Sequence, residues 1–337
     1  MHNLKLYALY KAKQPIIHTE ETIGNISKIK KMHVIHNGKP VPVPALSGNS
    51  FRGQFRDILA DQMFAILTNN GTNRVRLSPD HYGIIYSGGV MREGSTMGAQ
   101  MKAMADAIPM LRLMGSAFGN VMLPSKLAVT HIIPYAEETR AVLQSTVDVL
   151  PSKWRALLPA KPPGRGDLLS NDGPLTRKDD TKDLTKQRYV ETEADLSQDE
   201  ERTRRQMIYY VECIPAGTFL LQEIYSKYPL DDLELGCFFD GLLAFLQEPT
   251  LGGRSAAGYG QVEAKFWVCL DGQNFQLVSG QPNSLPQLVQ SAVKQYQQYV
   301  QRNRDRLLQT LNAQPEQNVQ EAQDAQEAPR DIPNSTT

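Results

Sequence analysis

Residues 231–268 read DDLELGCFFDGLLAFLQEPTLGGRSAAGYGQVEAKFWV and combine a predicted helix, a glycine-rich loop and a predicted strand. Apolar residues recur at helical spacing over 231–247, and polar and apolar residues alternate over 261–268. Nucleotide-cofactor loops run in the opposite order, from strand through glycines to helix, so that a helix N-terminus stands behind the phosphate. The order found here argues against a dinucleotide site or a P-loop. Two interpretations stay open: a loop that approaches a ligand with its backbone, or a helix C-cap followed by a turn.

The composition gives no global sign of a polyanion partner, because 36 basic residues balance 36 acidic ones. The balance is uneven along the chain. Residues 313–337 contain five acids and one base, so the rest of the chain has 35 bases against 31 acids and a net charge of +4. A local basic face therefore remains compatible with the sequence.

The three cysteines, Cys213, Cys237 and Cys269, lie far apart and form no C-x-x-C pair. This spacing argues against a disulfide framework and a zinc knuckle. The first residues lack the apolar core of a signal peptide, and no apolar run approaches the ~20 residues that span a membrane. We expect a cytoplasmic chain with no membrane partner.

Predicted strands alternate with predicted helices along the rest of the chain. Strands are expected at 3–10, 126–135, 207–224 and 261–268, and helices at 45–67, 95–114, 231–247 and 286–311. Asn49 or Ser50 is the expected N-cap of the first helix, and Pro109 should kink or end the second. Helix 95–114 carries a methionine-rich face, which we expect in the core. This element order predicts an α+β fold whose best match is an RRM-like, or ferredoxin-like, sheet.

Long segments interrupt this pattern. Residues 161–205 contain 21 charged residues among 45 and several turn signals, so they cannot build a core of their own and should protrude. We expect one domain over 1–312 with insertions at about 11–45, 68–105 and 161–205, followed by a disordered acidic tail over 313–337.

The stretch LSGNSFRGQFRD, at 46–57, concentrates the most chemistry. Arg52 and Arg56 are spaced i, i+4 at the start of a helix, so both project from one face near free backbone amides and the positive end of the dipole. This arrangement favours an anion, unless Asp57 or Asp61 is the partner of the arginines. A purely structural role for them stays open.

A second basic cluster, ISKIKKMHVIHNGK, contributes Lys28, Lys30 and Lys31. His33 and His36 lie in it without a third ligand, and no acid occurs between Gly24 and Val43. The segment therefore offers no carboxylate as a base or metal ligand. The chain also contains no nucleophile elbow and no H-E-x-x-H motif. We expect no metal, no cofactor and no catalytic residue.

Four stretches together resemble a known family. LSGNSFRGQFRD, LMGSAFGNVMLPSKLAV, VECIPAGTFLLQEI and LGGRSAAGYGQVEAKF follow one another in the order found in the RAMP superfamily of CRISPR proteins. They are most similar to its "Cas seven" backbone subunits, and the form G-N-S-F-R-G is most similar to that of type IV complexes. The set spans 46–266, most of the chain that is expected to be ordered.

The resemblance implies an RRM-derived palm with insertions called fingers and a thumb, the thumb lying within 161–205. It also implies copies stacked head to tail along a guide RNA, with other effector subunits and a target nucleic acid, DNA or RNA, as further partners. The residues that it places on the RNA are Asn49, Ser50, Arg52, Gly53, Arg56, Gly252, Gly253, Arg254, Ser255 and Tyr259. Lys28, Lys30, Lys31 and the thumb residues Arg177, Lys178 and Lys182 are further candidates.

Type III relatives cut target RNA with an acid in the loop after the first strand, and this sequence has none between Gly24 and Val43. We therefore expect a non-catalytic, guide-RNA-binding subunit, in which phosphate contacts give affinity and base pairing reads sequence. Two alternatives stay open: a type III-like subunit that cleaves RNA with an acid elsewhere, and a structural scaffold that binds no RNA.

Overall fold

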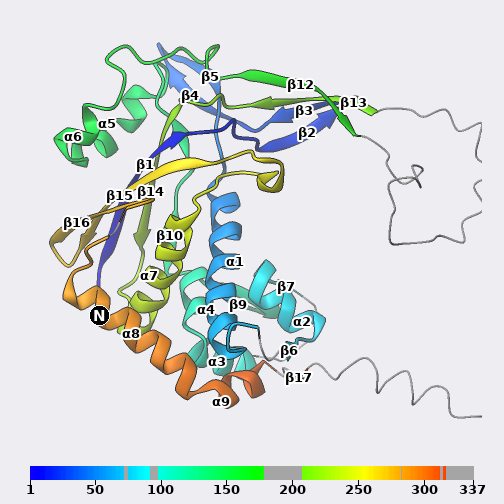
Figure 1. Ribbon diagram of the computed structural model, residues 1–337, viewed down its shortest axis with the longest axis vertical. Helices are drawn as coiled ribbons and strands as arrows, with labels where there is room; N and C mark the ends of the chain where they lie inside the picture. The colour runs from blue at the N-terminus through cyan, green and yellow to red at the C-terminus, as the bar shows by residue number, and fades with distance from the viewer. Residues whose placement is uncertain (72–74, 92–97, 178–206, 282, 312–313, 316–337) are drawn as a thin grey trace, which may run out of the picture.

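The computed structural model describes residues 1–71, 75–91, 98–177, 207–281, 283–311 and 314–315 (Figure 1). At its centre is an antiparallel sheet with the strand order β10-β14-β1-β15-β16. These strands are Leu127–Val129, Phe219–Ser226, Leu4–Ala12, Val262–Leu270 and Gln273–Val278. The short strand β11, Ile133–Pro134, also pairs with β14. Helices combined with an antiparallel sheet give the α+β class that the sequence predicts.

Strand β1 lies in the middle of the sheet and is buried on both faces. Leu4, Leu6, Ala8 and Tyr10 belong to the main hydrophobic core, whereas the alternate residue Leu9 belongs to a second core on the opposite face. Side chains of a strand alternate between its two faces, so this pattern places β1 between two hydrophobic cores, one on each side of the sheet.

Helices α1 (Gly48–Leu67), α7 (Asp232–Gln247) and α8 (Gln287–Arg302) contribute to the main core on one side of the sheet. Two glycines inside α7 allow its neighbours to approach closely. A Cβ on Gly241 would lie 2.4 Å from Leu59 Cδ2 of α1, and one on Gly236 would lie 2.1 Å from the Ala292 carbonyl oxygen of α8. The glycines are therefore required by helix packing, which outweighs their low helix propensity.

Helices α5 (Arg140–Val149) and α6 (Ser152–Arg155) cover part of the other face. Trp154 is 3% exposed and its ring meets Trp267 of β15 edge to face, with centroids 6.3 Å apart. Figure 1 shows both helices at the upper left, over the sheet. The covered part of this face is therefore closed to ligands.

Several predicted elements are divided in the structure. Predicted helix 95–114 becomes α3 (Gly98–Ala107) and α4 (Pro109–Met114), because Ile108 before the proline is extended. The predicted strand 207–224 becomes β13 (Met207–Cys213) and β14. A turn separates them, closed by a hydrogen bond from Thr218 N–H to the Pro215 carbonyl. The C-terminal helix divides into α8 and α9 (Arg304–Thr310).

The predicted N-cap of the first helix is wrong. Ser47, not Asn49 or Ser50, caps α1, because Ser47 is extended and its hydroxyl accepts from Ser50 N–H at 3.1 Å. The cap lies earlier because Gly48 fits against the 129–130 backbone, where a Cβ would come within 2.4 Å of the Val129 carbonyl oxygen.

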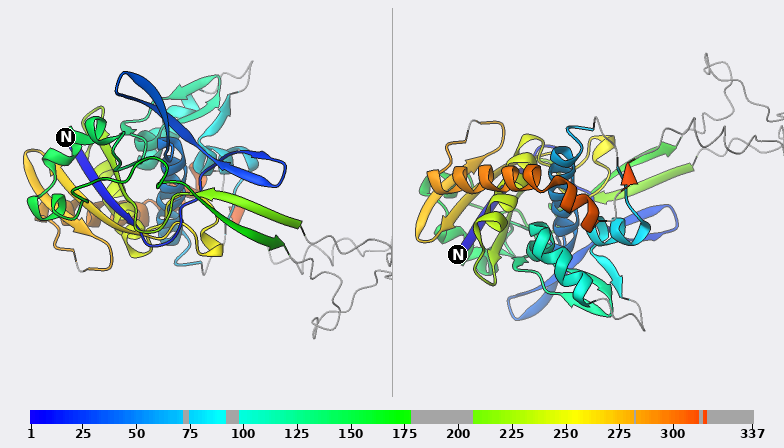
Figure 2. Two further views of the ribbon diagram at one scale, coloured as in Figure 1. Left: turned by 90° about the horizontal axis from the view of Figure 1, so that it is seen from above. Right: turned by 90° about the horizontal axis from the view of Figure 1, so that it is seen from below.

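A second sheet projects from the molecule, with the order β12-β13-β3-β2 (Figure 2). Its strands are Ser170–Arg177, Met207–Cys213, Ile26–Ile29 and Thr19–Ile23. The hairpin β4 (Lys31–His36) and β5 (Lys39–Pro44) follows in the chain. The predicted insertion at 11–45 is thus two hairpins, and one of them shares a sheet with the base of the predicted thumb.

The remaining elements lie between α1 and β10 and at the C-terminal end. They are β6 (Val75–Arg76), α2 (Pro79–Tyr82), the π-helix Gly83–Ser87, β7 (Gly89–Met91), β8 (Ser116–Gly119), β9 (Val121–Leu123) and β17 (Gln314–Pro315). Strand β17 pairs with β6, and the rest of the predicted tail lies outside the described residues. Within the described part of the chain, no helix combines the length and apolar character needed to cross a membrane.

Candidate nucleic-acid interface

The segment Pro15–His18, here called the seam, connects the two stretches that the sequence singles out. Gly253 N–H donates to the Ile17 carbonyl at 2.9 Å, and Gly260 N–H donates to the Pro15 carbonyl at 2.9 Å. On its other side, the Nε2 atom of His18 accepts a hydrogen bond from Ser47 N–H at 3.2 Å. The glycine-rich loop and the start of α1 are therefore neighbours across the seam, as Figure 1 shows beside the upper end of α1.

The glycines of the loop fall into two groups. A Cβ on Gly252 would lie 2.2 Å from the Ile17 carbonyl oxygen, and one on Gly260 would lie 2.2 Å from the Leu251 carbonyl oxygen, so both serve the packing of this chain. Gly253 and Gly258 have open space around the Cβ position. The exposed part of the loop is thus 253–258, which includes the 3₁₀ turn Ser255–Ala257.

Arg254 stands at the start of this exposed part in a left-handed conformation, with φ of 61°. Such a conformation costs a non-glycine residue roughly 1–2 kcal/mol. Its guanidinium carbon lies 5.0 Å from the centroid of the Tyr209 ring, and its side chain forms no ion pair with any residue that the structure describes. Arg254 is therefore an exposed cation, held by an aromatic ring, whose hydrogen-bond donors are available.

Tyr259 fixes the loop to the base of the projecting sheet. Its hydroxyl donates to the Asp172 carboxylate of β12, and its ring packs against Ile17, Val211 and Cys213. Burial, together with the Asp172 carboxylate, raises the pKa of Tyr259 to about 12. Tyr259 therefore holds the loop in place, and sequence reasoning, which placed it on RNA, did not foresee its partner.

Arg56 has a structural environment. The residue is 7% exposed, and its Nη2 atom donates to the Met114 and Gly115 carbonyls at 3.1 and 2.8 Å. Burial, reinforced by the neighbouring Arg52, lowers the pKa of Arg56 to about 10. Its Nη1 atom has no hydrogen-bond partner among the described residues. The guanidinium points into the protein, at the C-terminal end of α4.

Arg52 is half-buried and donates to the Met114 carbonyl at the same end of α4 at 2.6 Å, and to the Leu127 carbonyl of β10 at 3.4 Å. Neither Asp57 nor Asp61 forms an ion pair with Arg52 or Arg56, whose hydrogen bonds go to backbone carbonyls. Asp57 favours the charged form of Arg56 only through its nearby charge. Asn49 and Gly53 are exposed and Ser50 is half-buried, so the beginning of α1 still presents a polar surface.

The lysines of the second cluster are paired with acids of other strands, Glu20 of β2 and Glu212 of β13. Lys28 Nζ lies 2.7 Å from Glu212, Lys31 Nζ lies 3.9 Å from the same carboxylate, and Lys30 Nζ lies 2.7 Å from Glu20. Burial opposes ionisation of Glu212, but the lysines and the Ile29 amide overcome it and hold the pKa of that carboxyl below its ordinary value. The predicted basic surface is therefore largely neutralised.

The thumb candidates are described only in part. Arg177 is the last residue of β12, and Lys178 and Lys182 lie outside the described residues. Among the residues that the structure does describe, no group of three or more His, Cys, Asp or Glu side chains is arranged to hold a metal ion.

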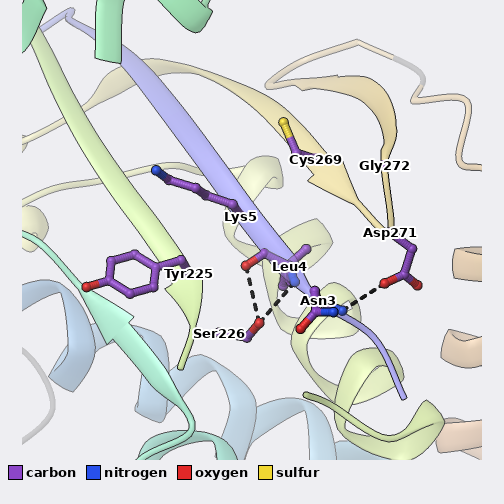
Figure 3. Close-up of a pocket in the computed structure, with 8 residues that line it drawn as sticks. All are labelled: Asn3, Leu4, Lys5, Tyr225, Ser226, Cys269, Asp271 and Gly272. Atoms are coloured by element: carbon purple, nitrogen blue, oxygen red, sulfur yellow. Dashed lines mark hydrogen bonds between the residues drawn. The ribbon is translucent and has the colours of Figure 1, made fainter. Parts of the chain in front are cut away.

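A concavity of about 510 Å³ opens at the end of the central sheet that α5 and α6 leave uncovered (Figure 3). Lys5, Tyr225 and Cys269 lie side by side there on three neighbouring strands, as the strand registers require. Lys5 is paired with Glu223 at 3.0 Å. None of the candidate RNA-binding residues lines this concavity, and none of the seam residues does.

Comparisons with known proteins give matches among solved structures only. No protein-family model and no curated protein matches the chain. The chain is similar to a chain of a type IV-B CRISPR complex, with a TM-score of 0.45 and 20% identity over 84% of this chain and 94% of that one. It is also similar to Csc2 from Thermofilum pendens, with a TM-score of 0.39 and 12% identity over 93% of this chain and 78% of that one.

Proposed function

We propose that this chain is a non-catalytic backbone subunit of a type IV CRISPR effector complex. In this proposal, copies of it stack head to tail along a guide RNA and present the guide for pairing with a target nucleic acid. The ordered set of four family-like stretches supports the proposal, because single stretches recur by chance more readily than an ordered series. The chain order β1-α1-β10-β14-α7-β15 supports it too, since β-α-β-β-α-β is the order of a ferredoxin-like, or RRM-like, palm.

The RNA path that we propose follows the seam and not the face of the sheet. RRM domains stack bases on aromatic side chains of an open sheet face. Here Tyr7 of β1 is 8% exposed, beneath the cluster that includes Leu143, Val147 and Trp154 of α5 and α6. The guide therefore contacts Arg254, Ser255 and the backbone at Gly253 on one side of the seam, and Asn49, Ser50 and Gly53 on the other.

Arg254 is the observation that carries the proposal. It occupies a strained conformation on an exposed loop, and its side chain stacks on Tyr209 without an acidic partner among the described residues. Strained residues of this kind cluster at binding sites, where function justifies their cost. A guanidinium with free donors is also well suited to phosphate oxygens.

The pairing of the acids beside the basic segment supports the part of the proposal that assigns this chain no catalysis. Glu20 and Glu212, the acids that pair with the basic segment, are engaged by Lys30 and by Lys28 with Lys31. Metal-dependent cleavage of a guide-complementary RNA at about six-nucleotide intervals would contradict this part of the proposal and favour a type III-like subunit.

The test is to purify the full chain from cells that express a CRISPR array and to sequence any RNA that remains bound. We expect spacer sequences with repeat-derived flanks, and oligomers that RNase treatment disperses. Monomeric protein with the absorbance ratio of pure polypeptide would overturn the proposal and favour a structural scaffold.

A further inference from the structure

Two histidine rings hold the N-terminus of α1. Ser47 N–H donates to His18 Nε2 at 3.2 Å, and Gly48 N–H donates to His131 Nδ1 at 3.0 Å. The amides at the start of a helix have no partners within the helix, so these rings satisfy donors that would otherwise need water or a side-chain cap. His18 comes from the seam, and His131 comes from the connection between β10 and β11.

A ring nitrogen accepts a hydrogen bond only while it carries no proton. Both histidines must therefore be neutral here, with their protons on His18 Nδ1 and His131 Nε2. Protonation would turn each acceptor into a donor that faces another donor. It would also place positive charge at the positive end of the α1 dipole. The two hydrogen bonds thus exist only in the neutral state of the rings.

These bonds fix the position of the residues that begin α1. Asn49 and Ser50 follow the two bonded amides directly, and the neighbouring residue of His18, Ile17, accepts the hydrogen bond from Gly253. The close approach of Gly48 to the 129–130 backbone leaves little room for an alternative position of this turn. The histidine pair therefore joins the seam, the start of α1 and the β10–β11 connection at one point.

We propose that His18 and His131 are positioning residues of the RNA-binding surface, which hold the first turn of α1 against the seam while neutral and release it on protonation. This inference rests on the proposed function. It predicts that RNA binding weakens as the pH falls, although added positive charge by itself would strengthen it. Release of the helix and added positive charge change RNA affinity in opposite directions, so a pH titration distinguishes them.

The charged groups around the rings are known from the neighbouring elements. Three ionisable groups act on His18: Lys30, which follows β3, Glu20 of β2, and His131. Lys30 and Glu20 also pair with each other at 2.7 Å. Arg52, on α1 itself, directs its guanidinium to the Met114 and Leu127 carbonyls. Burial, followed by Lys30 and His131, holds the pKa of His18 below its ordinary value, and Glu20 opposes this effect.

The experiment compares the wild type with a His18→Gln, His131→Gln double variant, because a glutamine carbonyl accepts an amide hydrogen bond but does not titrate. The affinity of RNA-free full-length protein for a fluorescent single-stranded RNA is measured between about pH 7.5 and about pH 5.5. We expect the wild type to lose about tenfold in affinity and the double variant to lose about twofold or less. His33→Gln, on the exposed β4–β5 hairpin, is the matched control and should keep the wild-type profile.

Equal pH profiles for the wild type and the double variant would overturn the inference. A wild-type affinity that rises on acidification, with the rise absent from the double variant, would also overturn it, because the rings would then be direct cationic contacts to phosphate. Absence of RNA binding at about pH 7.5 would contradict the proposed function instead. In that case, hydrogen exchange of the 48–52 amides tests separately whether His18 and His131 hold the first turn of α1. If they do, exchange at low pH is faster in the wild type than in the double variant.

Discussion

Arg254 combines two properties that single-residue changes can separate. The left-handed backbone costs roughly 1–2 kcal/mol, and an exposed cation stacked on the half-buried Tyr209 ring returns roughly 0.5–1 kcal/mol. Glycine would remove the strain but also lose the stack and gain entropy in the unfolded chain. These terms nearly cancel. Arg254 therefore brings little net stability, which favours a role in binding over a purely structural one.

We therefore predict that Arg254→Gly changes the free energy of unfolding by about 1 kcal/mol or less, while RNA affinity falls about tenfold or more, as expected for one lost charged hydrogen bond. Chemical denaturation and RNA titration measure the two quantities. Asn37→Gly is the control, because Asn37 also has a positive φ, 50°, in the turn of the β4–β5 hairpin. That variant should bind RNA like the wild type; a loss of stability in Arg254→Gly without a loss of binding would contradict the role of Arg254.

His2, which lies just before β1, provides a second single-residue prediction. Its ring bridges Asp232 at 2.7 Å and Asp271 at 2.6 Å. Burial works against the charged ring, but the two carboxylates outweigh it and raise the pKa of His2 above its ordinary value. The stabilisation is therefore fully present below the unfolded-state pKa and is lost as the pH rises through the higher folded-state pKa.

We expect the free energy of unfolding of the wild type to fall, relative to that of His2→Gln, as the pH is raised from about 6 to about 8.5. Parallel urea titrations at each pH measure the difference. A constant difference between the two proteins over this range would show that the bridge does not depend on the charge of His2.

Among the elements, α7 depends most on a buried ion cluster at its N-terminus. Glu234 is fully buried, and its carboxylate contacts Arg112 of α4 and Lys126, with Lys126 Nζ at 2.7 Å. The same carboxylate completes a capping box with Asp231. The cluster thus joins α4, α7 and the segment before β10, which all lie beside α1.

Replacing Glu234 by glutamine would leave Lys126 without its counter-charge and leave Arg112 with Asp231 alone, at 3.0 Å. Removal of one partner of a buried pair costs about 3–5 kcal/mol, so we expect a loss of this size in urea denaturation. Asp106→Asn is the matched control, because Asp106 pairs with Lys102 on an exposed helix surface, where such pairs contribute less than about 1 kcal/mol. Equal effects of the two variants would contradict the structural importance of the cluster.

For the molecule as a whole, the proposed RNA path and the covered sheet face should be independent. Trp154→Ala removes the side chain with which α6 covers the sheet, beside Trp267. We expect a loss of about 3–5 kcal/mol in stability, with RNA bound per folded protomer unchanged under conditions where the variant stays folded. A loss of RNA that exceeds the unfolded fraction would place RNA on the sheet face and contradict the path along the seam.

Much of this arrangement follows from local sequence patterns. The helical spacing of Leu235, Phe238 and Leu242 determined α7, the alternation before Trp267 determined β15, and Pro109 determined where the methionine-rich helix divides. Such patterns depend on residues a few positions apart, whose faces and backbone preferences are set by the period of a helix or strand.

The partners of the charged and ring side chains were decided by the tertiary structure alone. Glu212 neutralises Lys28 across 184 residues, and His131 reaches the amide of Gly48 across 83. No local period encodes such contacts, so the sequence identified Arg56 and Arg254 equally as candidates to bind an anion. Only folding buried the first against backbone carbonyls and left the second exposed on Tyr209, because burial and pairing depend on which distant segments the sheet brings together.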